Sequence, residues 1–270
     1  MNIVTKKVGC WWLVLLLMGV LWFTGLSRPV IAEPILIAAA SSVKFAFEET
    51  AREFYQKNPR TTVHFIFGSS GHHFGQIKNG APFDIFFSAD TGYPEKLYLE
   101  GLAASGEEMI PYAHGRLALW TGKKSWFNPK ADQIKLVLDP RIRKIAIANP
   151  RHAPYGRAAV EILKYYGLYR QAQSRLVMGE NIAQTAHFVQ SGAAQAGIIS
   201  LSMAVANPMI NNGVFWEIPV SSHQPVIQGL LLLRNGRNSE GAKAFVEFVL
   251  GCEGRKILRR FGFGDLRDLR

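Results

Sequence analysis

Short apolar runs with β-rich composition alternate along the chain with stretches whose apolar residues recur at helical spacing. This alternation is the strongest indication of the fold, because it predicts strands connected by helices. Residues 43–55, for example, carry apolar side chains every three to four positions with charged ones between them, which is typical of an amphipathic helix. We therefore expect an α/β fold with mostly parallel sheets flanked by helices. The runs that we predict as strands are 35–39, 63–67, 84–88, 117–120, 145–148, 196–199 and 227–233.

Residues 1–32 differ from the rest of the chain and are predicted to be a signal peptide. Lys6 and Lys7 form a short basic start, and the following residues 8–26 are uncharged and rich in leucine and tryptophan. Val30 and Ala32 then occupy the positions where signal peptidase requires small side chains. We expect export to the periplasm with cleavage after Ala32. The alternative is an uncleaved membrane anchor, since the uncharged run is just long enough to span a bilayer.

The cysteine and charge content limit what the exported chain can form and bind. Of the 2 cysteines, Cys10 lies in the predicted signal peptide and Cys252 stands alone in the remainder, so we expect no internal disulfide. A formal net charge of +11 first suggests a nucleic-acid or anionic membrane partner. The basic residues are scattered, however, and the densest group, at 255–260, is typical of a solvated helix face. We therefore expect no nucleic-acid partner.

Four predicted strand–helix junctions carry polar or conformationally permissive residues where the helix begins. Each alone is ordinary capping chemistry, since serine and asparagine are common N-caps and proline is common at the first helical position. Together they suit an oxyanion, because helix starts present unpaired N–H groups and serine hydroxyls add uncharged donors. Ligands of open α/β sheets also bind at this end of the strands. The four junctions are Ser41-Ser42, residues 68–71, residues 154–156 and Asn181-Ile182.

The residue types missing from these junctions narrow the choice of anion. No Asp, Glu, Lys or Arg occupies the junction positions, so the predicted pocket offers donors and few acceptors. A monoprotonated phosphate needs an acceptor for its own proton, whereas a fully ionised tetrahedral dianion does not. This favours a ligand such as molybdate, tungstate or sulfate. Because serine hydroxyls also accept hydrogen bonds, phosphate stays open.

Six segments of the chain resemble the periplasmic molybdate-binding proteins of ABC transporters. They are residues 38–41, 67–70, 80–90, 149–156, 179–182 and 260–263. The most specific is Gly-Ala-Pro-Phe-Asp-Ile-Phe-Phe-Ser-Ala-Asp at 80–90, and all six follow the order of the family. The resemblance implies a two-lobed type II periplasmic binding protein fold with the ligand in the interlobe cleft. It places the crossings near 113–115 and 221–225, which gives one lobe of residues 33–114 and 223–270 and a second of residues 115–222.

The same resemblance implies which residues hold the oxyanion. Ser41 and Ser70 match the two family serines that offer hydroxyl and amide, while Tyr155 and Ile182 match positions that offer backbone amides. The fifth family contact is often a tyrosine hydroxyl, and Ser200 stands at that position here with a shorter side chain. A membrane permease would recognise the lobes closed around the anion. The family implies a monomer without catalytic residues, cofactors or direct cation ligands, whose bound ligand is molybdate or tungstate.

Two other functions stay open on the sequence. One is a binding protein for another ligand, such as sulfate, phosphate, an organic anion or ferric iron, although iron requires carboxylate or tyrosine ligands at the junctions. The other is a serine hydrolase that uses Ser70, which lies close to His72 and His73. Against it, the chain has no Gly-x-Ser-x-Gly elbow, and adjacent side chains on one helix point about 100° apart. The 7 histidines also show no spacing typical of a zinc site.

Overall fold

The computed structural model describes residues 34–236 and 239–269. The chain from Glu33 onward forms one compact unit, and the predicted signal peptide lies outside the described residues. None of the helices in the described ranges combines the length and apolarity that a bilayer crossing requires.

The first of two five-stranded sheets is built from the two ends of the compact unit. Its strands are β1 (Ile35–Ala40), β2 (Val63–Gly68), β3 (Ile85–Ser88), β4 (Ile110–Gly115) and β10 (Val226–Leu232), in the order β2-β1-β3-β10-β4. Strand β1 pairs in parallel with β2 and β3, whereas β10 pairs antiparallel with β3 and β4. Four of the five strands therefore run in the same direction, and β10 alone is reversed.

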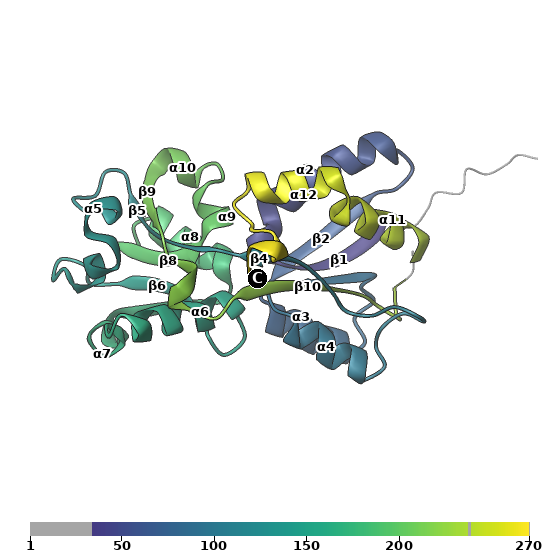
Figure 1. The fold of residues 1–270 in the computed structure, drawn as a ribbon, viewed down its shortest axis with the longest axis horizontal. Coiled ribbons are helices and arrows are strands. Elements are labelled where there is room, and N and C mark those ends of the chain that lie inside the picture. Colours follow the sequence, from purple (N-terminus) through teal and green to yellow (C-terminus); the bar gives the residue numbers. More distant parts are fainter. Residues whose placement is uncertain (1–33, 237–238, 270) are drawn as a thin grey trace, which may run out of the picture. The chain divides into compact units, whose positions relative to one another are not determined.

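The second sheet has the same plan and is built from the middle of the chain. Its strands are β5 (Leu117–Gly122), β6 (Ile145–Ala148), β7 (Leu176–Gly179), β8 (Ala196–Ser200) and β9 (Gly213–Glu217), in the order β7-β6-β8-β5-β9. Here β5 is the reversed strand, antiparallel to both β8 and β9. The prediction of two mostly parallel sheets flanked by helices is confirmed (Figure 1).

Helices cover both faces of the first sheet. One face carries α2 (Lys44–Lys57), which follows the short 3-10 turn η1 (Ser41–Val43), together with α11 (Ser239–Leu250) and α12 (Cys252–Arg260). The other face carries α3 (Ser70–Lys78) and α4 (Gly92–Leu99) (Figure 1). Phe47, Phe54 and Phe245 pack edge to face beneath the first group. Ile77 and Leu97 are buried in a separate cluster beneath the second.

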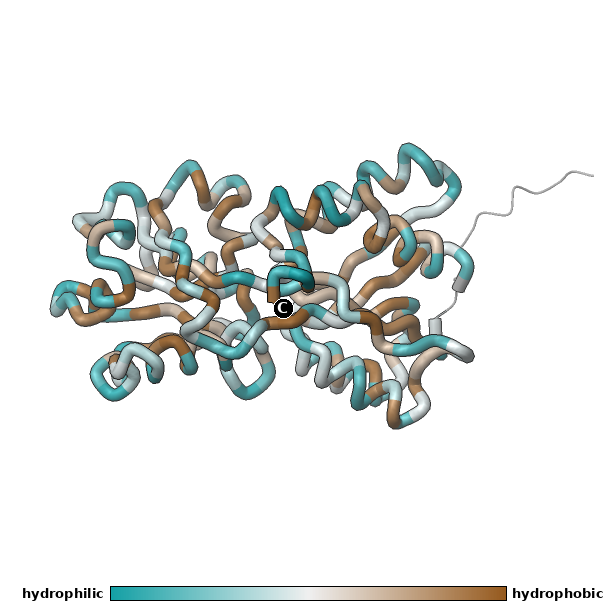
Figure 2. Tube along the Cα trace, in the orientation of Figure 1, coloured by the Kyte–Doolittle hydropathy of each residue, from teal (hydrophilic) through white to brown (hydrophobic). Residues whose placement is uncertain are grey.

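The second sheet is packed against α6 (Pro154–Tyr165) and α8 (Ile182–Gln190), which both contact β6. Apolar segments follow the strands of both sheets, while hydrophilic segments lie on the outer helices and loops (Figure 2). The remaining short elements are α5 (Pro129–Asp132), η2 (Gln133–Leu138), α7 (Tyr169–Ala172), η3 (Gln173–Arg175), α9 (Leu201–Ala204), α10 (Met209–Asn212), η4 (Val220–Ser222) and η5 (Leu266–Leu269).

The chain passes between the sheets in two places. It leaves the first sheet after β4 and enters the second at β5, and it returns between β9 and β10. The lobe limits inferred from the family resemblance lie at or next to these two connections and stay a prediction.

Candidate oxyanion site

Helix starts from both sheets line one small pocket. Its walls include Ser41 and Ser70 from the first sheet and Tyr155 and Ile182 from the second, and its cavity volume is about 10 Å³. Pockets for drug-sized organic ligands are typically about 300–1,000 Å³, so this one suits a small ion. The remaining lining residues are Ala40, Ser42, Gly68, Ser69, Ala89, Ala153 and Pro154.

Strand register brings these helix starts together. The parallel pairing of β1 and β2 sets Ala40 beside Gly68, so the serines that follow the two strands emerge at neighbouring points. In the second sheet, Ala148 lies beside Gly179, which places the starts of α6 and α8 close together in the same way. The carboxyl ends of parallel strands meet at one sheet edge, and this is where the four predicted residues lie.

The first residues of α6 and α8 offer backbone donors without partners inside their own helices. Pro154 is the first residue of α6, so Tyr155 supplies the first available N–H group of that helix. In α8 the Asn181 side chain accepts from the amides of Ala183 and Gln184, which leaves the amide of Ile182 outside this cap. Both amides therefore suit an anion in the pocket.

The two predicted serines are buried, but their hydroxyls are engaged differently. The amide of Ala89 donates to Ser70 Oγ at 2.9 Å, so the Ser70 hydroxyl proton remains available for a ligand. The Ser41 hydroxyl instead donates to the Gly68 carbonyl at 2.9 Å. Each serine can donate to an oxyanion, but Ser41 must first give up its bond to the backbone.

The pocket carries no charged side chain among its described lining residues. Ser42 and Ser69 also line it, although the family resemblance did not single them out. The signal for them was the doubled serine at each junction. Burial raises the pKa of the Tyr155 hydroxyl, so this group stays neutral and does not oppose a bound anion. The arrangement offers many donors and little competing negative charge, as the junction sequences predict.

Ser200 does not line the pocket. Its hydroxyl caps α9 by accepting from the amide of Met203, and it lies 2.9 Å from the Ser202 hydroxyl. Ser202 in turn donates to the carbonyl of Ser42 at 2.7 Å. The short Ser200 side chain therefore points toward the start of α9, which it caps. It is connected to the pocket only through Ser202 and the backbone of Ser42.

Polar contacts join the two sheets at the mouth of the pocket. The amide of Gly71 donates to the carbonyl of His152 at 2.9 Å, and His152 Nδ1 lies 3.0 Å from Ser69 Oγ. The Arg157 guanidinium forms an ion pair with Asp90, which also accepts from the amide of Tyr93. These contacts connect the two sides of the pocket.

His72, His152 and Glu180 gather at this mouth, with their ligand atoms within 4.8 Å of one another. The family resemblance implied no direct cation ligands, and the spacing of histidines along the chain gave no indication of a zinc site. Spacing cannot reveal this cluster, because its members come from three separate segments. Burial lowers the pKa of His152, while the nearby Glu180 carboxylate acts in the opposite direction.

The described structure does not bring a histidine to Ser70. His73 is turned inward, where its Nε2 lies 3.2 Å from the Ala39 carbonyl and its Nδ1 lies 3.1 Å from Gln76. His72 faces outward toward Glu180, so the two adjacent histidines diverge as predicted. The serine that a histidine contacts is Ser69, which was not the predicted nucleophile.

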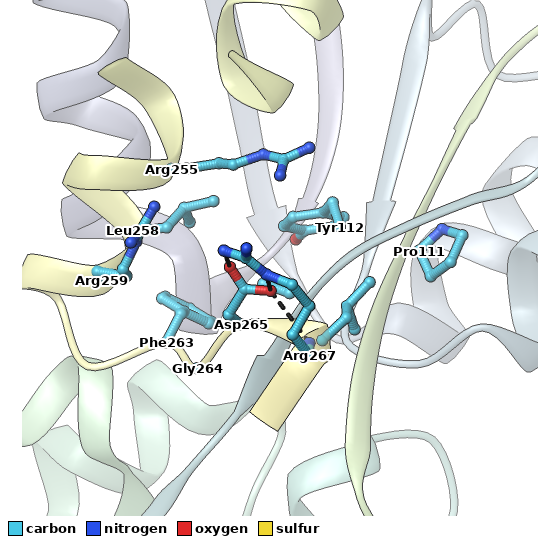
Figure 3. A pocket seen from close by; sticks show the side chains of 11 residues that line it. Pro111, Tyr112, Arg255, Leu258, Arg259, Phe263, Gly264, Asp265 and Arg267 are labelled. Carbon is cyan, nitrogen blue, oxygen red and sulfur yellow. Dashed lines mark hydrogen bonds and ion pairs between the residues drawn. The ribbon is translucent and has the colours of Figure 1, made fainter. Parts of the chain in front are cut away.

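A larger pocket of about 180 Å³ lies elsewhere, between β4 and the C-terminal segment (Figure 3). Arg255 and Arg259 reach it from α12, and both are exposed, in agreement with the predicted solvated helix face. The charge of Arg267 is already paired with Asp265, at 2.8 Å. The lining residues of this pocket do not include the helix starts that converge on the oxyanion site.

Comparison with known proteins relates the chain to solute-binding proteins. A profile of the bacterial extracellular solute-binding proteins matches residues 35–264. The chain is 33% identical to the molybdate-binding protein ModA of Azotobacter vinelandii over 233 residues, which are 86% of this chain and 90% of that protein. It is also 33% identical to ModA of Rhodobacter capsulatus over 239 residues, or 88% and 91% of the two chains.

Solved structures agree with this relationship. The periplasmic molybdate-binding protein of Azotobacter vinelandii aligns with a TM-score of 0.77 at 31% identity, covering 85% of this chain and 98% of that one. The sulfate-binding protein SubI from Mycobacterium tuberculosis H37Rv aligns with a TM-score of 0.67 at 15% identity, covering 86% and 87%. At that identity the second match establishes a shared fold and nothing about the ligand.

Proposed function

Because the chain belongs to the family of bacterial extracellular solute-binding proteins, we propose that it captures molybdate in the periplasm and delivers it to the permease of an ABC importer. The observation that carries the proposal is the convergence of four helix starts, two from each sheet, on one small uncharged pocket. Relatives named as molybdate-binding proteins support the choice of anion.

The contacts proposed for the anion are the hydroxyls and amides of Ser41 and Ser70 and the amides of Tyr155 and Ile182. Ser42 and Ser69 line the same pocket and are further candidate donors. Ser200 is proposed to support the pocket indirectly, by positioning Ser202 against the backbone carbonyl of Ser42. No direct cation ligand is needed at this pocket, since the metal enters as part of the oxyanion.

Binding is proposed to close two lobes, of residues 33–114 with 223–270 and of residues 115–222. The anion would contact Ser41 and Ser70 on one lobe and Tyr155 and Ile182 on the other, so it stabilises the closed form by contacts that an open form lacks. The permease would then select the closed, loaded form. This is a binding function without catalysis or a resident cofactor, carried out by a monomer.

Residues 1–32 are proposed to direct export, with cleavage after Ala32. Tungstate is expected to bind as molybdate does, because it is a tetrahedral dianion with the same acceptor oxygens. Sulfate is smaller, and donors fixed on helix starts cannot all move inward to reach it. Phosphate carries a proton near neutral pH, and the pocket offers it few acceptors.

Titration calorimetry tests the proposal with the chain from Glu33 onward, which is the compact unit. Under identical conditions, molybdate and tungstate should bind more tightly than sulfate and phosphate. Tighter binding of sulfate or phosphate than of molybdate would contradict the assignment of the anion. An absence of binding by all four anions would contradict oxyanion capture itself.

A further inference from the structure

Two histidines and a glutamate face one another at the mouth of the oxyanion pocket without lining it. His72 lies on α3, against the first sheet, whereas His152 and Glu180 follow β6 and β7 of the second sheet. His72 Nε2 lies 2.8 Å from Glu180 Oε1, and His152 Nε2 lies 3.4 Å from the same oxygen. The two imidazole rings stack with centroids 4.5 Å apart.

These separations fit a tetrahedral metal ion. Zinc binds imidazole nitrogen and carboxylate oxygen at about 2.0–2.2 Å, so two of its ligand atoms lie about 3.4 Å apart. The distance of 3.4 Å from the carboxylate oxygen to His152 Nε2 matches that value. The distance of 2.8 Å to His72 Nε2 is a hydrogen-bond distance, so His72 must move outward to admit the ion. The side chains of His72 and Glu180 are 55% and 46% exposed, so they can adjust and an ion can enter from solvent.

Hydrogen bonding at His152 is compatible with a cation bound at Nε2. Its Nδ1 lies 3.0 Å from Ser69 Oγ, and with Nδ1–H as donor the lone pair of Nε2 points outward. In that tautomer the lone pair faces the carboxylate of Glu180, and a cation between the two acceptors would join them; in the other tautomer Nε2–H faces the carboxylate itself. Metal-binding histidines usually donate their second ring N–H to such an acceptor, as in the first tautomer.

We propose that His72, His152 and Glu180 form a site for a divalent transition-metal ion of the zinc class, with solvent completing the coordination. Two imidazoles and one carboxylate are a ligand set that such ions accept, and they leave a position open. Because the ligands come from both sides of the cleft, the ion binds only when the cleft is closed. The ion and the oxyanion therefore strengthen each other's binding.

This coupling rests on the proposed function, whereas the metal site does not. Ser69 lines the oxyanion pocket and also contacts His152, so the two sites share a wall. Two ligands that favour the same closed form must each raise the affinity of the other by the same factor. The bound metal ion is thus expected to stabilise the closed, oxyanion-loaded form further.

The metal site is tested first with Zn²⁺ alone. The chain from Glu33 onward, without a histidine tag, competes with a chromophoric chelator for Zn²⁺ at pH 7.5 in the absence of oxyanion. We expect one bound equivalent, with the Kd raised at least about tenfold by His72→Gln on one side of the cleft and by Glu180→Gln on the other. His64→Gln is the control, because His64 is exposed at the beginning of β2, away from the mouth.

Unchanged Zn²⁺ affinity in His72→Gln and Glu180→Gln would overturn the site and would mean that the cluster is only a hydrogen-bonded contact. An equal loss in His64→Gln would also overturn it. Circular dichroism shows whether each variant is folded, and Glu180→Asp, which keeps the carboxylate, should recover part of the affinity.

The coupling is tested by titrating molybdate with Zn²⁺ present and with a chelator present. We expect molybdate to bind about fivefold or more tightly with Zn²⁺, and this difference to vanish in His72→Gln. Equal molybdate affinity in the two conditions would overturn the coupling. If molybdate does not bind in either condition, the oxyanion assignment fails, while the Zn²⁺ titration still decides the metal site by itself.

Discussion

The Ser70 hydroxyl accepts a hydrogen bond from the amide of Ala89 at 2.9 Å. This contact occupies a lone pair of the hydroxyl and leaves its proton free to point into the pocket. Ser41, on the same side of the pocket, uses its proton to reach the Gly68 carbonyl at 2.9 Å. One serine is thus arranged as a donor before the anion arrives, and the other must change partners.

We therefore expect Ser70→Ala to weaken molybdate binding more than Ser41→Ala. A hydrogen bond to a charged group contributes about 1.5–3 kcal/mol, which is the loss expected for Ser70→Ala. Ser41→Ala should lose less, because the wild-type hydroxyl gives up its bond to Gly68 on binding. Titration calorimetry measures both, with Ser191→Ala at the far end of α8 as the control. Unchanged affinity in both serine variants would place the anion elsewhere.

The ion pair between Arg157 and Asp90 links α6 to the loop after β3. We expect Arg157→Gln to weaken molybdate binding by up to about 1 kcal/mol, because the pair is partly exposed and favours only the closed arrangement. The difference from wild type should shrink as salt is added. Lys78→Gln removes the ion pair between Lys78 and Glu100. Both residues lie on the side of the first sheet, so this variant should leave the molybdate affinity unchanged. Equal effects of the two variants would argue against a role in closure.

Burial lowers the pKa of His73, whose ring lies between α3 and the first sheet and contacts the Ala39 carbonyl. A histidine with a lowered pKa in the folded state is neutral there, while the unfolded chain takes up a proton near pH 6.5. The free energy of unfolding should therefore fall as the pH drops below about 6.5, by at most about 1.4 kcal/mol per pH unit for one proton. Urea unfolding at pH 7.5 and pH 5.5 measures this.

His73→Gln should reduce that dependence on pH, even though it lowers stability at pH 7.5 by disturbing a buried contact. His64→Gln, at an exposed position on β2, should keep the wild-type dependence. A His73→Gln variant that loses as much stability between pH 7.5 and pH 5.5 as wild type would exclude His73 as the source.

The sequence predicted the inner strands better than the outer ones, for a physical reason. Strands β1, β3, β6 and β8 are covered on both faces and read as continuous apolar runs. Strands β4 and β9 lie at sheet edges and were missed, and the edge strand β7 was indicated only through the junction at Asn181 that follows it. Edge strands tolerate polar residues and proline, and β4 contains both, as Pro111 and His114.

Some features of the site could also be predicted from the sequence, while others depend on tertiary contacts. The junctions that contain Ser41, Ser70, Tyr155 and Ile182 were predictable because each follows a strand, and parallel strands bring such positions together. The choice of these four residues within the junctions came from the family resemblance. The contacts of His72 with Glu180 depend on how two distant segments approach across the cleft, and no local pattern encodes that approach. The position of Ser200 depends on a choice between facing the pocket and capping a helix, and the structure shows the cap.

Gly71 lies where the backbones of the two sides of the pocket meet, and it provides a test of closure. A Cβ atom at this position would lie 2.7 Å from His152 Cβ, 2.8 Å from Tyr93 Oη and 2.9 Å from the His152 carbonyl oxygen. Gly71→Ala should therefore hold the cleft apart and weaken molybdate binding, by about tenfold or more if closure is required. Alanine is a better helix former than glycine by up to about 1 kcal/mol, and the Tyr93 hydroxyl is the end of a side chain that can move aside, so the melting temperature should not fall.

Gly75→Ala is the matched control, since it lies on the same helix and a Cβ there meets no atom within 4 Å. It should gain the same helical stability and bind molybdate as wild type does. Calorimetric titration and thermal unfolding of the two variants thus separate closure from folding. Equal molybdate affinity in Gly71→Ala and Gly75→Ala would mean that the approach of Gly71 to His152 is not needed for binding.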